Sequence, residues 1–174
     1  MLRRGRAGAG MSTDSPRAEP SIGGCEPDDR GAAPLFQAFS ELCIATRGPG
    51  STEFTEEIAR WLGEVGALDG IVHLFVRHTS ASLLIQENAD PDVQRDLVDA
   101  LRRLAPEGAH YRHDSEGPDD MPAHIKAMVM PVALTIPVLG GRMRLGTWQG
   151  IHLVEHRLRP HTREVALHFI GSRT

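Results

Sequence analysis

The sequence predicts one α+β domain, in which a mostly antiparallel sheet packs with two main helices. Two segments carry apolar residues three and four positions apart, the spacing of one face of a helix. Several shorter segments are rich in β-branched residues, and the last four of them are joined by tight turns that contain glycine. Tight turns join antiparallel neighbours, whereas parallel strands need long crossovers. We therefore expect helices packed against an antiparallel sheet.

Residues 35–174 are predicted to form this domain, and residues 1–34 a disordered N-terminal extension in which Met11 is an alternative start. The extension is rich in glycine, proline, alanine, serine and charged residues. Such a composition buries little apolar surface, so burial does not offset the entropy lost on ordering. The rest of the chain is long enough for one domain with its own core.

The net charge of −4 is spread along the chain without a basic stripe, so we expect no nucleic-acid partner. The longest apolar run, MVMPVALTIPVL, is too short to cross a membrane and contains two prolines. Cys25 and Cys43 form no CxxC pair, which favours a reducing compartment. The opening segment lacks an apolar stretch of signal-peptide length. These features predict a cytoplasmic protein with no membrane partner.

The first half of the domain is predicted to run strand, helix, strand, strand. Residues 35–47 favour a strand that stops at the breaker GPG. Residues 51–66 favour a helix that Thr52 or Thr55 could cap. Its apolar stripe is Phe54, Ile58, Trp61, Leu62 and Val65. Residues 71–77 and 82–86 then favour two strands.

A second helix is predicted to begin after Asp90, a favoured N-cap residue, with Pro91 in its first turn. Its apolar stripe is Val93, Leu97, Ala100, Leu101 and Leu104. Residues 106–122 form a long polar loop, and such loops are usually functional or disordered. A short helical piece follows around residues 123–128. The segments VALTIPVL, RMRLGT, WQGIHLVEHR and REVALHFIG are then predicted to form an antiparallel meander.

Three titratable side chains continue the buried faces of predicted strands. Side chains two positions apart share a face, and the apolar sets lead to His78, Glu87 and Glu155. In the last of these strands the opposite face, with His152 and His156, is a weaker alternative. A buried charge needs a partner, so the three groups indicate a polar pocket. The alternative is that the strand ends fray and water solvates these groups.

The long loop and the helix start after it carry imidazoles and carboxylates, the ligand types that divalent metals take. These residues are His113, Asp114, Asp119, Asp120 and His124. A catalytic metal needs three such ligands and an open position. The spacing matches no sharp motif such as HEXXH, so a polar surface loop and acidic helix caps stay open as alternatives. GxSxG and Walker sequences are absent too, which argues against the usual serine hydrolases and nucleoside triphosphatases.

The segments HTSASLLIQENADPDV, YRHDSEGPDDMPAHIKA and LTIPVLGGRMRLGTWQGI, followed by an E-H-R strand, together resemble the YjbQ family. The resemblance covers the chain from about Phe36 to the C-terminus. It implies a small α+β fold that assembles as a homotrimer. It also implies a secondary thiamine-phosphate synthase, a transferase that joins hydroxymethylpyrimidine diphosphate to thiazole phosphate with release of pyrophosphate. The motif positions correspond here to His78, Thr79, Glu87, Asn88, Asp90, His113, Pro122, His124, Gly146, Thr147, Trp148, Gln149 and Glu155.

These patterns lead to one hypothesis for the site. We predict that three histidines bind a divalent metal ion (Zn, Mn or Mg), and these are His78, His113 and His124. The predicted catalytic residues are Glu87 and Glu155 as acid or base, and Asp120, which would orient a histidine. The predicted substrate-binding residues are Thr79, Ser80, Asn88, Trp148 and Gln149. The metal would stabilise the leaving diphosphate of a phosphorylated small molecule, and an aromatic ring would stack on the pyrimidine.

A second hypothesis belongs to another class. The chain could be a metal-dependent hydrolase, or a metabolite-binding housekeeping protein with only incidental thiamine-related activity. Measured turnover of thiamine precursors, compared with binding of other metabolites, would separate the two hypotheses.

Overall fold

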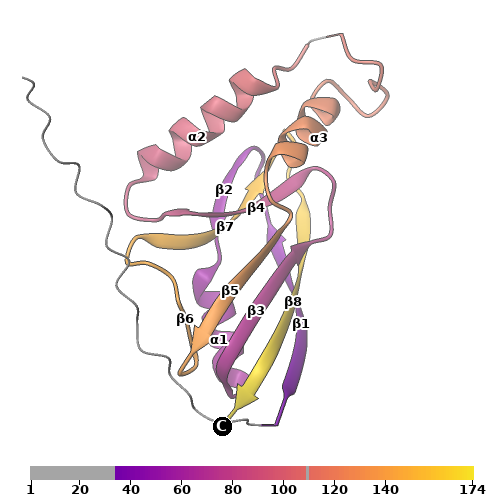
Figure 1. Cartoon of the computed structure of the whole chain (residues 1–174). Coiled ribbons are helices and arrows are strands. Elements are labelled where there is room, and N and C mark those ends of the chain that lie inside the picture. Colours follow the sequence, from indigo (N-terminus) through magenta and orange to yellow (C-terminus); the bar gives the residue numbers. More distant parts are fainter. Residues whose placement is uncertain (1–33, 109) are drawn as a thin grey trace, which may run out of the picture. The chain divides into compact units, whose positions relative to one another are not determined.

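A computed structural model describes residues 34–108 and 110–174 (Figure 1). The predicted extension, residues 1–34, lies outside the described residues except for Pro34. The strands are β1 (Phe36–Ala45), β2 (Gly50–Glu53), β3 (Ala67–Val76), β4 (Ala81–Glu87), β5 (Ala133–Leu139), β6 (Arg142–Met143), β7 (Gln149–Glu155) and β8 (Thr162–Arg173). The helices are α1 (Thr55–Glu64), α2 (Pro91–Leu104) and α3 (Asp120–Val129). In this part of the chain no helix is long and apolar enough to cross a membrane.

The strands form two sheets, and every pair of neighbours is antiparallel. The larger sheet has the order β1-β8-β3-β5-β6, and the smaller has the order β2-β7-β4. The predicted α+β class with a mostly antiparallel sheet is therefore confirmed. The predicted four-stranded meander is wrong, because β7 belongs to the smaller sheet and β8 lies between β1 and β3.

One buried cluster fills the space among the two sheets and α1, and strand parity decides which residues enter it. In β3 the predicted face of Val72, Leu74 and Val76 is buried. In β7 both faces are buried, so the main face and the weaker alternative each hold. The predicted stripe of α1 contributes Phe54, Ile58, Trp61 and Leu62 to the same cluster. The alternation of apolar side chains was thus a sound guide to the core.

The helix α2 begins as predicted, but its apolar stripe is not buried. The Asp90 carboxylate accepts a hydrogen bond of 2.8 Å from the N–H of Asp92, and Pro91 occupies the first turn. No residue of α2 is buried, and Leu104 is 57% exposed. The stripe predicts where the helix forms because its period is local. Whether the stripe is buried depends on which other elements pack against it, and periodicity does not predict that packing.

Two local predictions are wrong at the start of the domain. Residues 50–53 form the short strand β2, whereas the sequence predicted a turn at GPG and a helix from residue 51. The N-cap of α1 is Phe54, and no side chain caps this helix. Thr55 instead donates a hydrogen bond to Glu53 and accepts one from the N–H of Ile151. Pairing with β7 therefore overrides the local capping preference.

One end of the domain gathers strand ends from both sheets, and α3 lies there (Figure 1). The last residues of β3 pair with the first residues of β5 and β8. The end of β7 pairs with the start of β4, where Glu155 lies opposite Ala81. The helix α3 directly precedes β5 and extends at both ends beyond the predicted residues 123–128. Segments that are distant in sequence therefore meet around α3.

Two glycines allow β3 and β8 to come close at the other end of the larger sheet, and they generate a stability prediction. A Cβ atom on Gly171 would lie 2.2 Å from the carbonyl oxygen of Asp69, and one on Gly70 would lie 2.3 Å from that of Ile170. We expect Gly171→Ala to lower the free energy of unfolding by roughly 1–3 kcal/mol, because backbone must move apart to admit the methyl group. Urea unfolding measures this loss.

Gly63→Ala is the matched control. Gly63 lies in α1 with no heavy atom within 4 Å of a built Cβ, so alanine should raise stability by up to about 1 kcal/mol. Equal effects of the two substitutions would contradict the proposed close approach.

Candidate metal centre

Three residues with metal-ligating side chains come together at the start of α3. Asp120 and His124 are four positions apart and so share one face of the helix, while His113 reaches them from the preceding loop. One ligand atom from each residue lies within 4.8 Å of the others. The long polar loop thus supplies part of a built cluster, and two of the three predicted metal ligands belong to it.

Both imidazoles point a nitrogen at the same carboxylate oxygen. The distance from Asp120 Oδ2 to His113 Nε2 is 2.7 Å, and to His124 Nε2 it is 3.4 Å. The Nδ1–H of His124 donates to the carbonyl oxygen of Thr79 at 3.1 Å. In a neutral His124 the Nε2 therefore carries a lone pair and faces a carboxylate. A proton or a cation between these atoms would relieve that repulsion.

The other acidic residues of the loop have different positions. Asp114 does not belong to the group. Asp119 occupies the N-cap position of α3 but makes no capping hydrogen bond with its side chain, so the cap interpretation is wrong for this residue. Its carboxylate instead accepts hydrogen bonds from Arg157 and from the N–H of Leu158. Burial alone would raise the pKa of Asp119, but these two partners bring it below its ordinary value.

Arg157, which follows β7, connects the cluster to the rest of the domain. Its Nε donates to Asp119 Oδ2 at 2.9 Å, and its Nη1 donates to Asp120 Oδ1. Its Nη2 donates to the carbonyl oxygen of Glu116 at 2.8 Å. One guanidinium thus holds the loop and the first turn of α3 in place.

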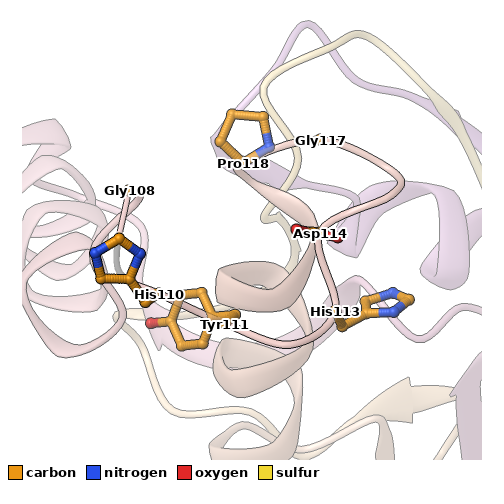
Figure 2. A pocket seen from close by; sticks show the side chains of 7 residues that line it. All are labelled: Gly108, His110, Tyr111, His113, Asp114, Gly117 and Pro118. Atoms are coloured by element: carbon orange, nitrogen blue, oxygen red, sulfur yellow. The ribbon is translucent and has the colours of Figure 1, made fainter.

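Two hollows adjoin the cluster. One, of about 300 Å³, is lined by the loop that includes His110, Tyr111 and His113. In Figure 2 the ring of His113 points away from His110 and Tyr111. The other, of about 580 Å³, includes His124 in its lining. Its further lining residues are Phe75, Val76, Arg77, His78, Thr79, Ala127, Met128 and Val132. The second hollow combines an apolar wall with polar groups beside the cluster.

Glu155, a predicted acid or base, is fully hydrogen-bonded at the same end. Arg163 donates to both of its oxygens at 2.7 and 2.6 Å, Thr46 donates at 2.8 Å, and the N–H of Arg157 donates at 2.9 Å. Burial alone would raise the pKa of Glu155, but these donors, Arg163 foremost, lower it. The carboxylate is therefore held ionised, which suits a structural anchor better than proton transfer.

His78, Thr79 and Ser80 lie at this end but differ in what they offer. His78 Nε2 accepts a hydrogen bond of 2.9 Å from the N–H of Glu164, so the neutral ring carries its proton on Nδ1 and has no free nitrogen for a metal. The structure does not bring His78 into the cluster of His113, Asp120 and His124. Thr79 is exposed beside the second hollow. The Ser80 hydroxyl accepts from Arg163 at 3.2 Å and is buried.

The remaining predicted residues lie at the opposite end of the smaller sheet. Glu87 pairs with Gln149, six residues along β4 from the pair of Ala81 with Glu155, a separation of about 20 Å. Asn88 donates from its N–H to the carbonyl oxygen of Trp148 at 3.0 Å. The indole of Trp148 is 65% exposed. Within one chain, these residues lie far from the cluster of His113, Asp120 and His124.

Sequence reasoning missed Arg157, Arg163 and Thr46. One signal was present, because a buried Glu155 requires a cationic partner. Several arginines follow it within eight residues, and periodicity does not say which of them turns inward. The position of Arg163 in β8 makes that choice.

His156 directly follows β7 and affects how the stability of this end of the domain depends on pH. It is buried, and its Nε2 lies 2.9 Å from the hydroxyl of Ser82. Lys126 of α3 lines the same small cavity. Burial, followed by the charge of Lys126, lowers the pKa of His156 from 6.5 to about 4.

The fold and the site define a class: a two-sheet α+β protein with a His–Asp–His group at one end. The model of the family described as "UPF0047 protein YjbQ-like" matches residues 40–172. The chain belongs to this family.

Curated relatives and solved structures agree with this assignment. A UPF0047 protein of Synechocystis is 49% identical over 80% of this chain and 97% of its own length. The UPF0047 protein YjbQ of Escherichia coli O157:H7 is 41% identical over 71% of this chain and 91% of its own. A crystal structure of a yjbq/upf0047 family protein of Clostridium acetobutylicum, 35% identical, has a TM-score of 0.70 and covers 75% of this chain and 98% of its own. These names state no activity.

We expect the low pKa of His156 to make stability depend on pH. Between pH 6.5 and about 4 the unfolded chain binds a proton at this residue and the folded chain does not, so stability falls as the pH falls through this window. The loss from this group is at most roughly 3 kcal/mol and levels off below pH 4. Urea unfolding of His156→Gln at several pH values should show a flatter dependence.

His110→Gln is the control for this measurement, because His110 is exposed. A pH dependence of His156→Gln equal to that of the unsubstituted protein would show that His156 is not responsible.

Proposed function

We propose that His113, Asp120 and His124 bind one divalent metal ion, with Zn, Mn and Mg as the candidates. The observation that carries this proposal is the convergence of two imidazole nitrogens on one carboxylate oxygen. Two neutral imidazoles and one carboxylate form a ligand set typical of catalytic metal sites, which keep a further position open. Thr79 supports the set by fixing His124 through its carbonyl oxygen.

We propose that the substrate is a phosphorylated small molecule and that the reaction is a thiamine-phosphate synthase reaction. Bound at the cluster, the metal would supply positive charge to stabilise a leaving diphosphate. The adjoining hollow of about 580 Å³ is within the size range of small-molecule sites. Its apolar wall, with Phe75 and Val132, suits the face of a pyrimidine ring, and the side chain of Thr79 suits a phosphate oxygen. The guanidinium of Arg77 in the same lining is already paired with Glu41 and Glu164.

A metal-dependent hydrolase is the second candidate, and one observation favours it. Within one chain, Trp148 lies at the far end of the smaller sheet and does not reach the metal group. A hydrolase needs only the metal, a water molecule and a binding surface, all of which the cluster end can supply.

We propose a homotrimer, and a second copy could bring the two ends together. The support is the apolar surface that one chain leaves exposed, on the outer face of the larger sheet and along α2. These side chains include Phe39 in β1, Ile71 in β3 and Leu104 at the end of α2, and Trp148 is exposed separately, just before β7. Exposed apolar patches of this kind mark interaction surfaces.

Protein purified without a His tag tests the metal directly. We expect it to bind one Zn or Mn ion per chain, as measured by titration calorimetry and elemental analysis. Asp120→Asn should lower the affinity at least 100-fold, because the shared ligand oxygen loses its charge. His124→Gln should do the same, and circular dichroism checks that each variant is folded.

Asp114→Asn is the matched control, since Asp114 lies in the same loop outside the group. Equal affinities of the Asp120 and Asp114 variants would remove the proposed centre.

Mixing two inactive variants tests the reaction and the shared site together. We expect slow turnover of hydroxymethylpyrimidine diphosphate and thiazole phosphate by the metal-loaded protein, and loss of it in both Asp120→Asn and Trp148→Ala. If a second copy supplies Trp148, unfolding and refolding the two variants together should restore part of the activity. Light scattering measures the trimer. Hydrolysis of the diphosphate without coupling would favour the hydrolase instead.

A further inference from the structure

The two oxygens of Asp120 have different partners. Oδ2 faces the two histidines, and Oδ1 accepts a hydrogen bond from Nη1 of Arg157. The Asp120 side chain is only 3% exposed, so water does not compete freely for either oxygen. The carboxylate therefore presents one oxygen to the cluster and keeps the other engaged.

The guanidinium that occupies Oδ1 is itself fixed. Its other nitrogens donate to Asp119 and to the carbonyl oxygen of Glu116, and the Arg157 side chain is 15% exposed. Asp119 is held in turn by the N–H of Leu158. Releasing Oδ1 would require a concerted change in several hydrogen bonds, so Arg157 cannot yield easily to a metal ion.

We propose that Arg157 is a specificity-determining residue that selects which metal the centre accepts, an inference that rests on the proposed function. With Oδ1 occupied, Asp120 can offer a metal only one oxygen. Zn²⁺, which favours four ligands in proteins, is satisfied by two imidazoles, one oxygen and an open position. Ions that favour more oxygen ligands, such as Mn²⁺ and Ca²⁺, lose the second carboxylate oxygen.

A purely structural role is the competing explanation. Arg157 joins the segment after β7 to the loop before α3, and its loss could simply loosen the cluster. Loosening the cluster would lower the affinity for every metal ion by a similar factor, whereas release of Oδ1 would change the affinity for one ion relative to another. The ratio of two affinities separates these explanations where a single affinity does not.

The experiment measures Zn²⁺ and Mn²⁺ affinities of the full-length apo protein by competition with a chromophoric chelator. We expect the unsubstituted protein to prefer Zn²⁺, and Arg157→Met to lower the Zn²⁺ to Mn²⁺ affinity ratio at least tenfold. Arg157→Lys keeps a donor for Oδ1 and should retain most of the preference. Co²⁺-loaded protein should show the strong visible absorption of a four-coordinate site, and Arg157→Met should weaken it.

Arg159→Met is the matched control, because Arg159 is an exposed arginine two residues further along the same segment, and its ratio should not change. A ratio unchanged in a folded, metal-binding Arg157→Met protein would overturn this inference alone. If Arg157→Lys and Arg157→Met lowered the Zn²⁺ to Mn²⁺ affinity ratio equally, the inference would also be overturned. Failure of the unsubstituted protein to bind either ion would overturn the proposed metal centre, and the inference with it.

Discussion

The buried ion pair between Glu155 and Arg163 joins the two sheets at the end of the domain where the candidate site lies. Glu155 closes β7 of the smaller sheet, and Arg163 lies in β8 of the larger sheet. Both side chains are less than 5% exposed, so the pair loses its hydration on folding. Thr46 and the N–H of Arg157 add two more donors to the carboxylate. Full hydrogen bonding offsets the desolvation that a bare pair would suffer.

The site depends on this pair through Arg157. The N–H that donates to Glu155 and the guanidinium that holds Asp119 and Asp120 belong to the same residue. The position of the first turn of α3 is therefore linked to the junction of the sheets. The cluster of His113, Asp120 and His124 is pre-organised, because groups that the core already holds orient Asp120.

The predicted site residues divide into two sets in one chain. His113, Asp120 and His124 gather at one end of the smaller sheet, while Glu87, Asn88 and Trp148 lie near the other. The exposed indole lies on a turn held by backbone hydrogen bonds, since Gln149 donates to Gly146 and Asn88 donates to Trp148. A rigid turn with an exposed aromatic ring is well suited to contact another molecule. In the proposed trimer, this exposed turn of one chain would contact a second copy.

The sequence by itself determined what short-range geometry controls. The alternation in β3 identified Val72, Leu74 and Val76 as core, and the Asp90 cap marked the start of α2. The short helix after the loop was also predicted, but only around residues 123–128, so the prediction left Asp120 in the loop, whereas the structure begins α3 at Asp120. Only the tertiary structure decided that β8 lies between β1 and β3, that Nε2 of His78 accepts a hydrogen bond from a backbone N–H, and that Arg157 meets Asp120. Periodicity reports on neighbours along the chain, whereas the Arg157 and His78 contacts join residues 37 and 86 positions apart, and they form only when the whole core packs.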